Sequence, residues 1–284
     1  MIKTIYNTEE VIEFAWELGQ NNFYASYPRK KTIKETEEAI ERSIREENRK
    51  VIACYNENVL RGVCMYYWEP SEKYAQTEMF LIKEDYGQIA EEFIGYISKE
   101  LHGYEIYIGF PIDNENANKY FMGNNIECLD HSIDTRLYNL SAPVNKEYEQ
   151  VERITENNFE EYAAFHDKYA IPFEMYYNSK NLHKDMERFR VFVFRQDEAI
   201  HGSIFVKTFK DGAEVFGLFI DEEYKNNGIE GILINEMLFN LYKEFGALKE
   251  IVYFIDEDSS EELNIALSSG FEIKDRYRCY KYKL

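Results

Sequence analysis

The sequence predicts an α+β fold built twice, with a mixed sheet flanked by helices in each half of the 284-residue chain. Three observations lead to this prediction. The length corresponds to about two domains of roughly 150 residues each. Three segments of the first half recur in the second half in the same order. In both halves helices come first, followed by a strand hairpin, a strand, a helix, a strand, a helix and a final strand.

The internal repeat covers the predicted strands of both halves. The matched pairs are Val51–Tyr67 with Val191–Lys207, Phe80–Tyr86 with Leu218–Tyr224, and Glu105–Phe110 with Glu250–Ile255. The offsets lie between 138 and 145 residues. The first pair is a hairpin whose second strand opens with Gly62 or Gly202. Three ordered matches at a nearly constant offset indicate a duplicated domain.

The predicted helices precede the hairpins. In the first half they are residues 8–20 and 33–48, and in the second half they are residues 158–168 and a shorter helix at 182–188. Pro143, in the segment Ser141–Val144, ends the preceding strand and begins a linker. The sequence therefore predicts one domain over residues 1–142 and a second over 143–284.

Composition excludes several classes of protein. A net charge of −20, shared equally by the two halves, argues against a nucleic-acid-binding or anionic-membrane protein. The four cysteines form no CxxC pair, which fits neither a zinc site nor a disulfide scaffold, so we expect free thiols and no metal. The chain shows no signal-peptide pattern and no apolar run long enough for a membrane span. These features favour a cytoplasmic protein.

One loop has the pattern of an anion site. The apolar strand Val215–Ile220 runs through an acidic turn into Lys225–Gly231, and a helix with apolar residues at every third or fourth position follows. The first N–H groups of a helix lack partners and lie at the positive end of its dipole. Gly228 allows close approach of a phosphate to the backbone. The alternative is an ordinary turn that caps the helix.

The segment LFIDEEYKNNGIEGILI resembles the pyrophosphate-binding motif of the GCN5-related N-acetyltransferases (GNAT), usually Arg/Gln-x-x-Gly-x-Gly/Ala. Lys225 stands at the Arg/Gln position, Gly228 matches, and Glu230 replaces the second small residue. Ser259–Phe271 resembles the family's next motif, which ends in Gly-Phe, and DRYRCYKYKL resembles its closing strand. Through the repeat, the resemblance extends more weakly to residues 51–139.

The resemblance implies two tandem acyl-CoA N-acyltransferase-like domains with acetyl-CoA as co-substrate. It also implies that Leu218–Ile220 form a splayed strand that pairs with the pantetheine arm, and that the loop after it binds the pyrophosphate. The implied cofactor-binding residues are Leu218, Phe219, Ile220, Lys225, Asn226, Asn227, Gly228, Ile229, Glu230 and Gly231.

Two departures from the family pattern bear on function. Ala266 stands where many relatives have the tyrosine that protonates the leaving thiolate, and Ser259 replaces the usual asparagine. In the first half, about three residues of the phosphate loop are missing between Tyr86 and Ile89. We therefore expect the N-terminal domain to be a degenerate copy and the C-terminal domain to bind one acyl-CoA.

The expected reaction is direct attack of a primary amine on the acyl thioester. Glu214, at the start of the strand beside which the acceptor would lie, is the candidate base, with a solvated strand-end residue as the alternative. The acidic surface favours a small, cationic amine acceptor. His166, His183 and His201 show no metal-ligand spacing and are expected to be packing or surface residues. The alternative function is a non-catalytic acyl-CoA sensor or interaction module.

Overall fold

The computed structural model describes residues 1–142, 148–170, 175–225 and 227–284. The chain forms two compact units. Unit 1 comprises Met1–Ser132 and Asp275–Leu284, and unit 2 comprises Ile133–Lys274. Strands β6 (Glu127–Tyr138) and β12 (Glu272–Lys283) therefore each contribute residues to both units. The predicted boundary after residue 142 separates the two repeats along the chain. The compact units are divided differently, because β6 and β12, the last strand of each repeat, contribute residues to both units.

Unit 1 contains a mixed sheet in the order β1-β2-β3-β4-β5-β12-β6. β4 and β5 are parallel, and the pairs β1–β2, β2–β3, β3–β4 and β5–β12 are antiparallel. The remaining strands are β1 (Ile2–Thr4), β2 (Arg49–Asn56), β3 (Val59–Glu69), β4 (Tyr74–Ile82) and β5 (Glu105–Pro111). The helices are η1 (Thr8–Glu10), α1 (Ile12–Gly19), α2 (Ile33–Arg45), α3 (Tyr86–Glu100) and α4 (Glu115–Gly123).

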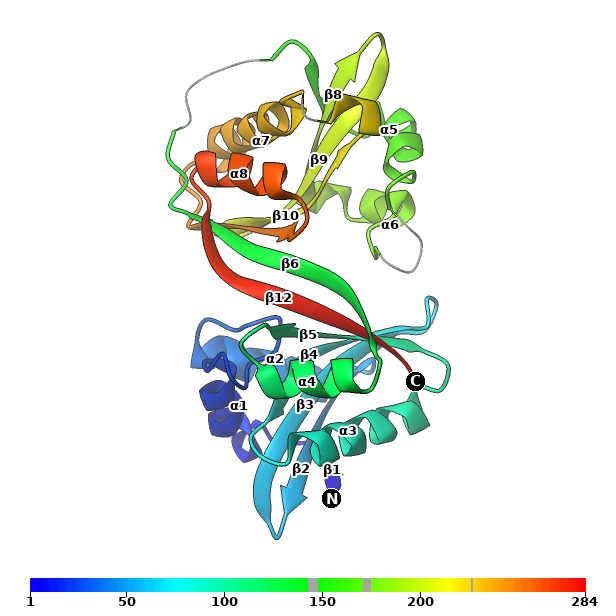
Figure 1. The fold of residues 1–284 in the computed structure, drawn as a ribbon, viewed down its shortest axis with the longest axis vertical. Coiled ribbons are helices and arrows are strands. Elements are labelled where there is room, and N and C mark those ends of the chain that lie inside the picture. Colours follow the sequence, from blue (N-terminus) through cyan, green and yellow to red (C-terminus); the bar gives the residue numbers. More distant parts are fainter. Residues whose placement is uncertain (143–147, 171–174, 226) are drawn as a thin grey trace. The chain divides into compact units, whose positions relative to one another are not determined.

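Each face of this sheet carries its own hydrophobic core. Helices α3 and α4 lie over one face and α1 and α2 over the other (Figure 1). Side chains alternate along a strand, so Ile52 packs with α3 and α4 while its neighbour Val51 packs with α1 and α2. Phe80 and Phe93 meet edge to face at 5.5 Å between ring centres in the first of these cores. The predicted pair of hydrophobic strands thus forms the middle of a two-sided sheet.

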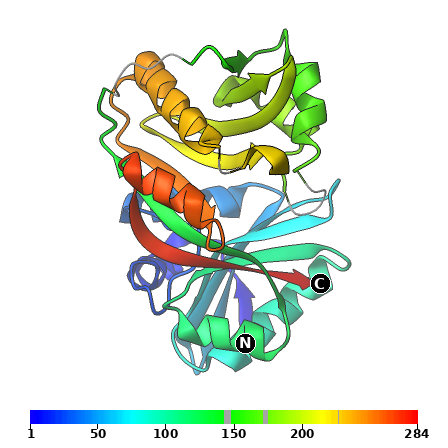
Figure 2. The same ribbon diagram turned by 45° about the horizontal axis from the view of Figure 1, so that its top comes forward.

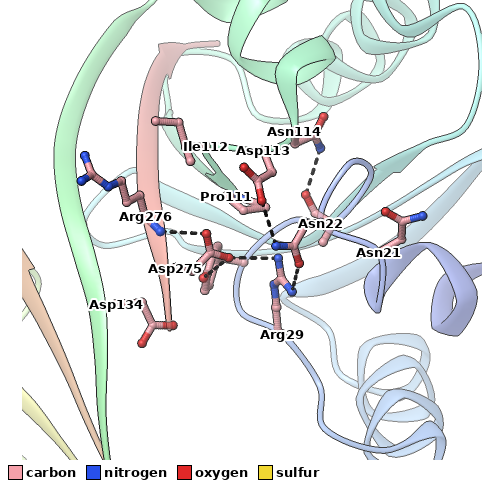
Figure 3. A network of polar contacts seen from close by, with 12 residues as sticks. Asn21, Asn22, Arg29, Pro111, Ile112, Asp113, Asn114, Asp134, Asp275 and Arg276 are labelled. Atoms are coloured by element: carbon pink, nitrogen blue, oxygen red, sulfur yellow. Dashed lines mark hydrogen bonds and ion pairs between the residues drawn. The ribbon is translucent and has the colours of Figure 1, made fainter. Parts of the chain in front are cut away.

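A polar network holds the segment between α1 and α2 against the rest of unit 1 (Figure 3). Arg29 donates to Asn22 Oδ1 at 2.7 Å and to Asp275 Oδ2 at 3.1 Å. Asn22 in turn donates to Asp113 at 3.1 Å, and Tyr27 donates to Asp275 at 3.2 Å. The segment before α2 is therefore tied both to the end of β5 and to β12.

Unit 2 repeats this architecture, with strand order β6-β11-β10-β9-β8-β7. β10 is parallel to β11 and antiparallel to β9. The strands are β7 (Val151–Ile154), β8 (Phe189–Gln196), β9 (Ala199–Phe209), β10 (Gly212–Ile220) and β11 (Glu250–Asp256). The helices are α5 (Phe159–His166), α6 (Ser179–Lys184), η2 (Met186–Arg188), η3 (Glu222–Tyr224), α7 (Ile229–Phe245) and α8 (Ser260–Ser268).

Helices α7 and α8 cover one face of the unit 2 sheet, and α5 and α6 cover the other (Figure 2). A Cβ atom at Gly202 would come within 2.8 Å of Ile220 Cδ1 and 3.0 Å of Ile229 Cγ2, so glycine here lets α7 approach the sheet. Gly62 has the same role in unit 1, where a Cβ atom would lie 3.1 Å from Ile89 and from Phe93. Ile89 and Ile229 are therefore equivalent positions.

The α+β fold with two repeated units is confirmed, and the differences concern helix ends. The first predicted helix divides into η1 and α1, because Asn7 caps Glu9 with a 3.1 Å hydrogen bond and a new turn begins after it. The helix predicted to reach residue 48 ends at Arg45, since Glu46 is already extended. The helix predicted at 182–188 is α6 followed by η2. The predicted linker lies partly outside the described residues.

Candidate functional site

Strands β10 and β11 separate in the middle of unit 2. The described pairing between them runs from Gly212–Glu250 to Val215–Tyr253 and stops there, while β10 remains paired with β9 to Ile220. A bulge between Val215 and Gly217 turns β10 at this point. Leu218–Ile220, where the splay was expected, therefore belong to the part of β10 that has no described pairing with β11.

A cavity of about 420 Å³ opens beside this free stretch of β10. Its wall combines β10, the loop before α7, and the beginning of α8. The lining residues are Tyr169, Leu218, Phe219, Ile220, Lys225, Glu230, Asp258, Ser259, Ser260, Glu261 and Glu262. The strand and loop that the sequence assigned to an acyl-CoA therefore meet at one cavity.

The loop before α7 has the geometry of an anion cradle. Gly228 caps the helix in the left-handed region, with φ of 78°, and a Cβ atom there would have no neighbour within 4 Å. The N–H groups of Ile229, Glu230 and Gly231 belong to the first turn, where a helix offers no acceptors of its own. Asn227 is in the same bend, whereas Asn226 lies outside the described residues. Lys225 forms an ion pair with Glu222 at 2.6 Å.

The floor of the cavity is acidic. Glu230 is only 6% exposed, and its Oε2 has no hydrogen-bond partner among the described residues. Glu262 accepts a hydrogen bond from the Tyr253 hydroxyl. Burial raises the pKa of the Glu262 carboxyl to about 7, and the neighbouring Glu230 raises it as well. An anion at the loop would therefore lie close to two carboxyl groups, of which one can hold a proton at neutral pH.

Glu214 occupies β10 two residues before the bulge, opposite Lys207 on β9 and Val252 on β11. Burial raises the pKa of its carboxyl above the usual value, and the charges of Arg136 and Lys207 offset this in part. The next residue that points to the same side of the strand is Phe216, which packs on the α5–α6 face. Glu214 is thus a half-buried carboxyl just before the splay, with a raised pKa, and it is not among the residues that line the cavity.

The side chains around Phe219 support the free stretch of β10. The Tyr169 ring stacks on Phe219 with centres 5.2 Å apart, and its hydroxyl donates to Asp221 at 2.6 Å. His201 bonds Asp221 at 3.0 Å and stacks on Tyr224 at 3.9 Å. This cluster fixes the turn between β10 and the Gly228 loop.

The other histidines take the structural roles that the sequence predicted. His166 is fully buried, with Tyr162 Oη at 2.8 Å from its Nδ1 and Tyr177 O at 2.7 Å from its Nε2. His183 lies on the surface, 2.8 Å from Glu156. Among the described residues, no group of three acidic, histidine or cysteine side chains has the arrangement of a metal site.

Unit 1 contains the same splay, but its own chain fills it. The described pairing of β4 with β5 ends at Gln76–Tyr107. Beyond it, Tyr27 N donates to Gly109 O on β5 at 2.8 Å, and Phe80 N on β4 donates to Ser26 Oγ at 2.8 Å. Ser26 is 4% exposed. The strand edge equivalent to the one that lines the cavity in unit 2 is therefore already bonded in unit 1.

The site residues of unit 2 also lack counterparts in unit 1. Strand register and helix packing identify the equivalent positions in the two units, and in unit 1 these positions hold uncharged residues. Gln76, Ala90 and Ala117 are the equivalents of Glu214, Glu230 and Glu262, and Ile108 is the equivalent of Tyr253. α3 starts at Tyr86, three residues before Ile89, whereas α7 starts at Ile229 itself, so a helical turn replaces the loop in unit 1.

The predicted cofactor-binding residues did not include six residues that line the cavity, Tyr169, Asp258, Ser259, Ser260, Glu261 and Glu262. For Glu262 a signal existed, because it precedes Ala266 by one helical turn and so lies on the same face of α8. Tyr169 carried no such signal, since its place beside Phe219 depends on how α5 packs on the sheet.

No family model matches the sequence, and no curated protein matches it significantly. Solved structures match along the whole chain. A GCN5-related N-acetyltransferase from Sphaerobacter thermophilus has a TM-score of 0.68 at 10% identity, with 99% of this chain and 95% of that one covered. A tandem GNAT protein from the clavulanic acid biosynthesis pathway, solved without acetyl-CoA, has a TM-score of 0.62 at 10% identity, with 100% and 98% covered.

A GNAT acetyltransferase from Colwellia psychrerythraea has a TM-score of 0.54 at 12% identity, with both chains fully covered. Likeness at these identities shows the fold. The chain has the GNAT fold in a two-domain form, as the sequence motifs predicted. Among the described residues, no helix combines the length and the apolar character that a membrane crossing requires.

Proposed function

We propose that the protein is an acyl-CoA-dependent N-acyltransferase that moves an acetyl group from acetyl-CoA to a primary amine. The observation that carries this proposal is the cavity of unit 2, where the free edge of β10, the Gly228 loop and the start of α7 meet. The fold shared with acetyltransferases supports it.

The residues of the cavity fit the parts of the co-substrate. The free peptide groups of Leu218–Ile220 are available to pair with the pantetheine amides. The first N–H groups of α7 and the open side of Gly228 suit the pyrophosphate, with Lys225 as the nearby cation. Holding donor and acceptor in near-attack geometry would supply much of the rate.

Glu214 is the proposed base. A carboxyl with a raised pKa is a better proton acceptor than a fully exposed glutamate, and Glu214 is half-buried just before the splay. The amine would attack the thioester carbon while its proton passes to Glu214 directly or through water. A backbone N–H of the free stretch of β10 would stabilise the developing oxyanion.

The proposed acceptor is a small cationic amine, since the chain carries a net charge of −20. The test is a panel of polyamines, aminoglycosides, aryl-alkylamines and acidic amino acids with acetyl-CoA, followed by free-thiol release and by mass of the product. Acetylation of at least one cationic amine is expected. Binding of acetyl-CoA without transfer to any amine would instead identify a sensor.

A further inference from the structure

The proposed reaction releases a thiolate for which the site has no evident proton donor. A CoA thiolate has a conjugate-acid pKa of about 8.5, so at neutral pH its departure is assisted by a proton. Ala266, where the family resemblance implies a tyrosine, is fully buried and offers only a methyl group. The donor must therefore be another side chain at the cavity, or water.

Glu262 lies in the right part of the cavity. It precedes Ala266 by four residues in α8, so both residues lie on the same face of the helix. Its side chain lines the same cavity as Leu218 and Ile220, the strand edge proposed to hold the pantetheine arm. The hydroxyl of Tyr253, at the last β10–β11 pair before the splay, bonds to Glu262 Oε1 and fixes the carboxyl at this position.

The surroundings bring the protonation of this carboxyl into the neutral pH range. Burial raises the pKa of Glu262 to about 7; Glu230 from α7 and Asp256 from the end of β11 raise it, and the Tyr253 hydrogen bond lowers it. The other charged groups that line the cavity are Lys225, Asp258 and Glu261. An acid of this strength transfers its proton favourably to a thiolate whose conjugate acid has a pKa of about 8.5.

The described residues of unit 1 have no equivalent of the pair of Tyr253 and Glu262. In unit 1 the equivalent positions are Ile108 and Ala117, both fully buried in an apolar core. Unit 2, where the splay is open, therefore contains the carboxyl and its hydroxyl partner. Unit 1, where Ser26 fills the splay, has neither at the equivalent positions.

We propose that Glu262, held by Tyr253, donates the proton that converts the leaving thiolate of CoA into the free thiol. This inference rests on the proposed acyl transfer. The amine nitrogen forms the C–N bond and loses a proton toward Glu214, the C–S bond breaks, and its electron pair stays on sulfur. Sulfur then takes the proton of Glu262, which solvent restores. The sum is an amide and CoA thiol.

The test compares the full-length wild type with Glu262→Gln, Tyr253→Phe and the surface control Glu272→Gln, using acetyl-CoA and the best amine found. We expect Glu262→Gln to lower kcat by about a hundredfold, since it cannot donate this proton, with little change in the affinity for CoA. The wild-type kcat should fall as pH rises through about 7, the pKa of Glu262, and this alkaline limb should be absent in Glu262→Gln.

Tyr253→Phe separates a proton-donating role from a structural one. Because the Tyr253 hydroxyl lowers the pKa of Glu262, its loss should move the alkaline limb to higher pH while the carboxyl remains. A wild-type kcat and an unchanged alkaline limb in a folded, CoA-binding Glu262→Gln protein would overturn the inference and leave the acyl transfer intact. A wild type that binds acetyl-CoA and acylates no amine would overturn both.

Discussion

At the scale of single residues, the site is a set of carboxyl groups in unequal surroundings. Glu214 is half-buried before the splay and has a raised pKa, Glu262 shares a hydrogen bond with Tyr253, and Glu230 has an oxygen with no hydrogen-bond partner among the described residues. Groups whose surroundings separate their proton affinities can divide the roles of acid and base. The roles proposed for Glu214 and Glu262 follow from this division.

Glu214→Gln is expected to lower kcat by about 10²-fold or more, because the amide cannot accept the proton of the amine. A base acts in its deprotonated form, so wild-type activity should rise with pH through the pKa of Glu214, which burial places above 4.5. That acidic limb should vanish in the variant. The pH profile of kcat measures both effects, with exposed Glu187→Gln as control; a variant that retains the wild-type limb would remove Glu214 from this role.

Glu230→Ala is expected to strengthen CoA binding by about tenfold, because a carboxylate beside the pyrophosphate repels it across a short, partly desolvated distance. The variant should also unfold at a higher temperature, since a buried oxygen without a partner is removed. Alanine is the residue at the equivalent position of unit 1, Ala90, which is fully buried in α3. Calorimetric titration and a melting curve test both; weaker binding would show that Glu230 supports the ligand.

At the scale of elements, the two repeats differ in how the sheet meets the following helix. In unit 2 a loop with Gly228 precedes α7, and in unit 1 the turn at Tyr86 is already part of α3. The splay survives in both units, but Ser26 and Tyr27 bridge it in unit 1. Binding of the phosphate-bearing arm of CoA would require both a loop that accepts the phosphates and a free strand edge. Among the described residues, unit 2 has both features and unit 1 has neither.

Each chain is therefore expected to bind one CoA. Gly228→Glu should abolish this binding, because the new side chain adds bulk and negative charge where the phosphates would lie. Gly87→Glu, on the exposed first turn of α3, should leave the affinity unchanged. Gly103→Glu is the control for a side chain at positive φ, since Gly103 in unit 1 has φ of 80° and open space for a Cβ atom. Titration calorimetry that finds two equivalent sites, or wild-type affinity in Gly228→Glu, would contradict the assignment.

The elements show which parts of the molecule a sequence can predict. The hairpins, the glycine loop before α7 and the repeat follow from local spacing, and the strands and helices around them begin and end within a few residues of the predicted positions. The bridge made by Ser26 and the contact of Tyr253 with Glu262 join residues 54 and 9 positions apart in sequence. No periodic pattern encodes such contacts, because they depend on where strands diverge. The sharing of β6 and β12 between units was invisible for the same reason, since each repeat ends in a similar strand.

At the scale of the whole molecule, the dominant property is the net charge of −20. Such a field would attract the proposed cationic acceptor and repel CoA, which is a polyanion, and dissolved salt would weaken both effects. The two substrates of the proposed reaction should therefore respond to salt in opposite directions.

With added salt, kcat/KM for the best cationic amine should fall, and the association rate of CoA should rise. Initial rates at several concentrations of sodium chloride measure the first quantity, and stopped-flow binding measures the second. A neutral amine with measurable activity serves as the reference. A value of kcat/KM for the cationic amine that rises or stays flat with salt would contradict electrostatic steering.

The division of β12 between the units affects the order in which the protein is completed during synthesis. Residues 275–283 provide the strand that pairs with β5 from Tyr277–Pro111 to Lys283–Glu105. The ribosome adds these residues after those of unit 2, which ends at Lys274. Unit 1, although its other residues are translated first, therefore exposes the edge of β5 until residues 275–283 become available. The first unit to be translated needs the last strand to be completed.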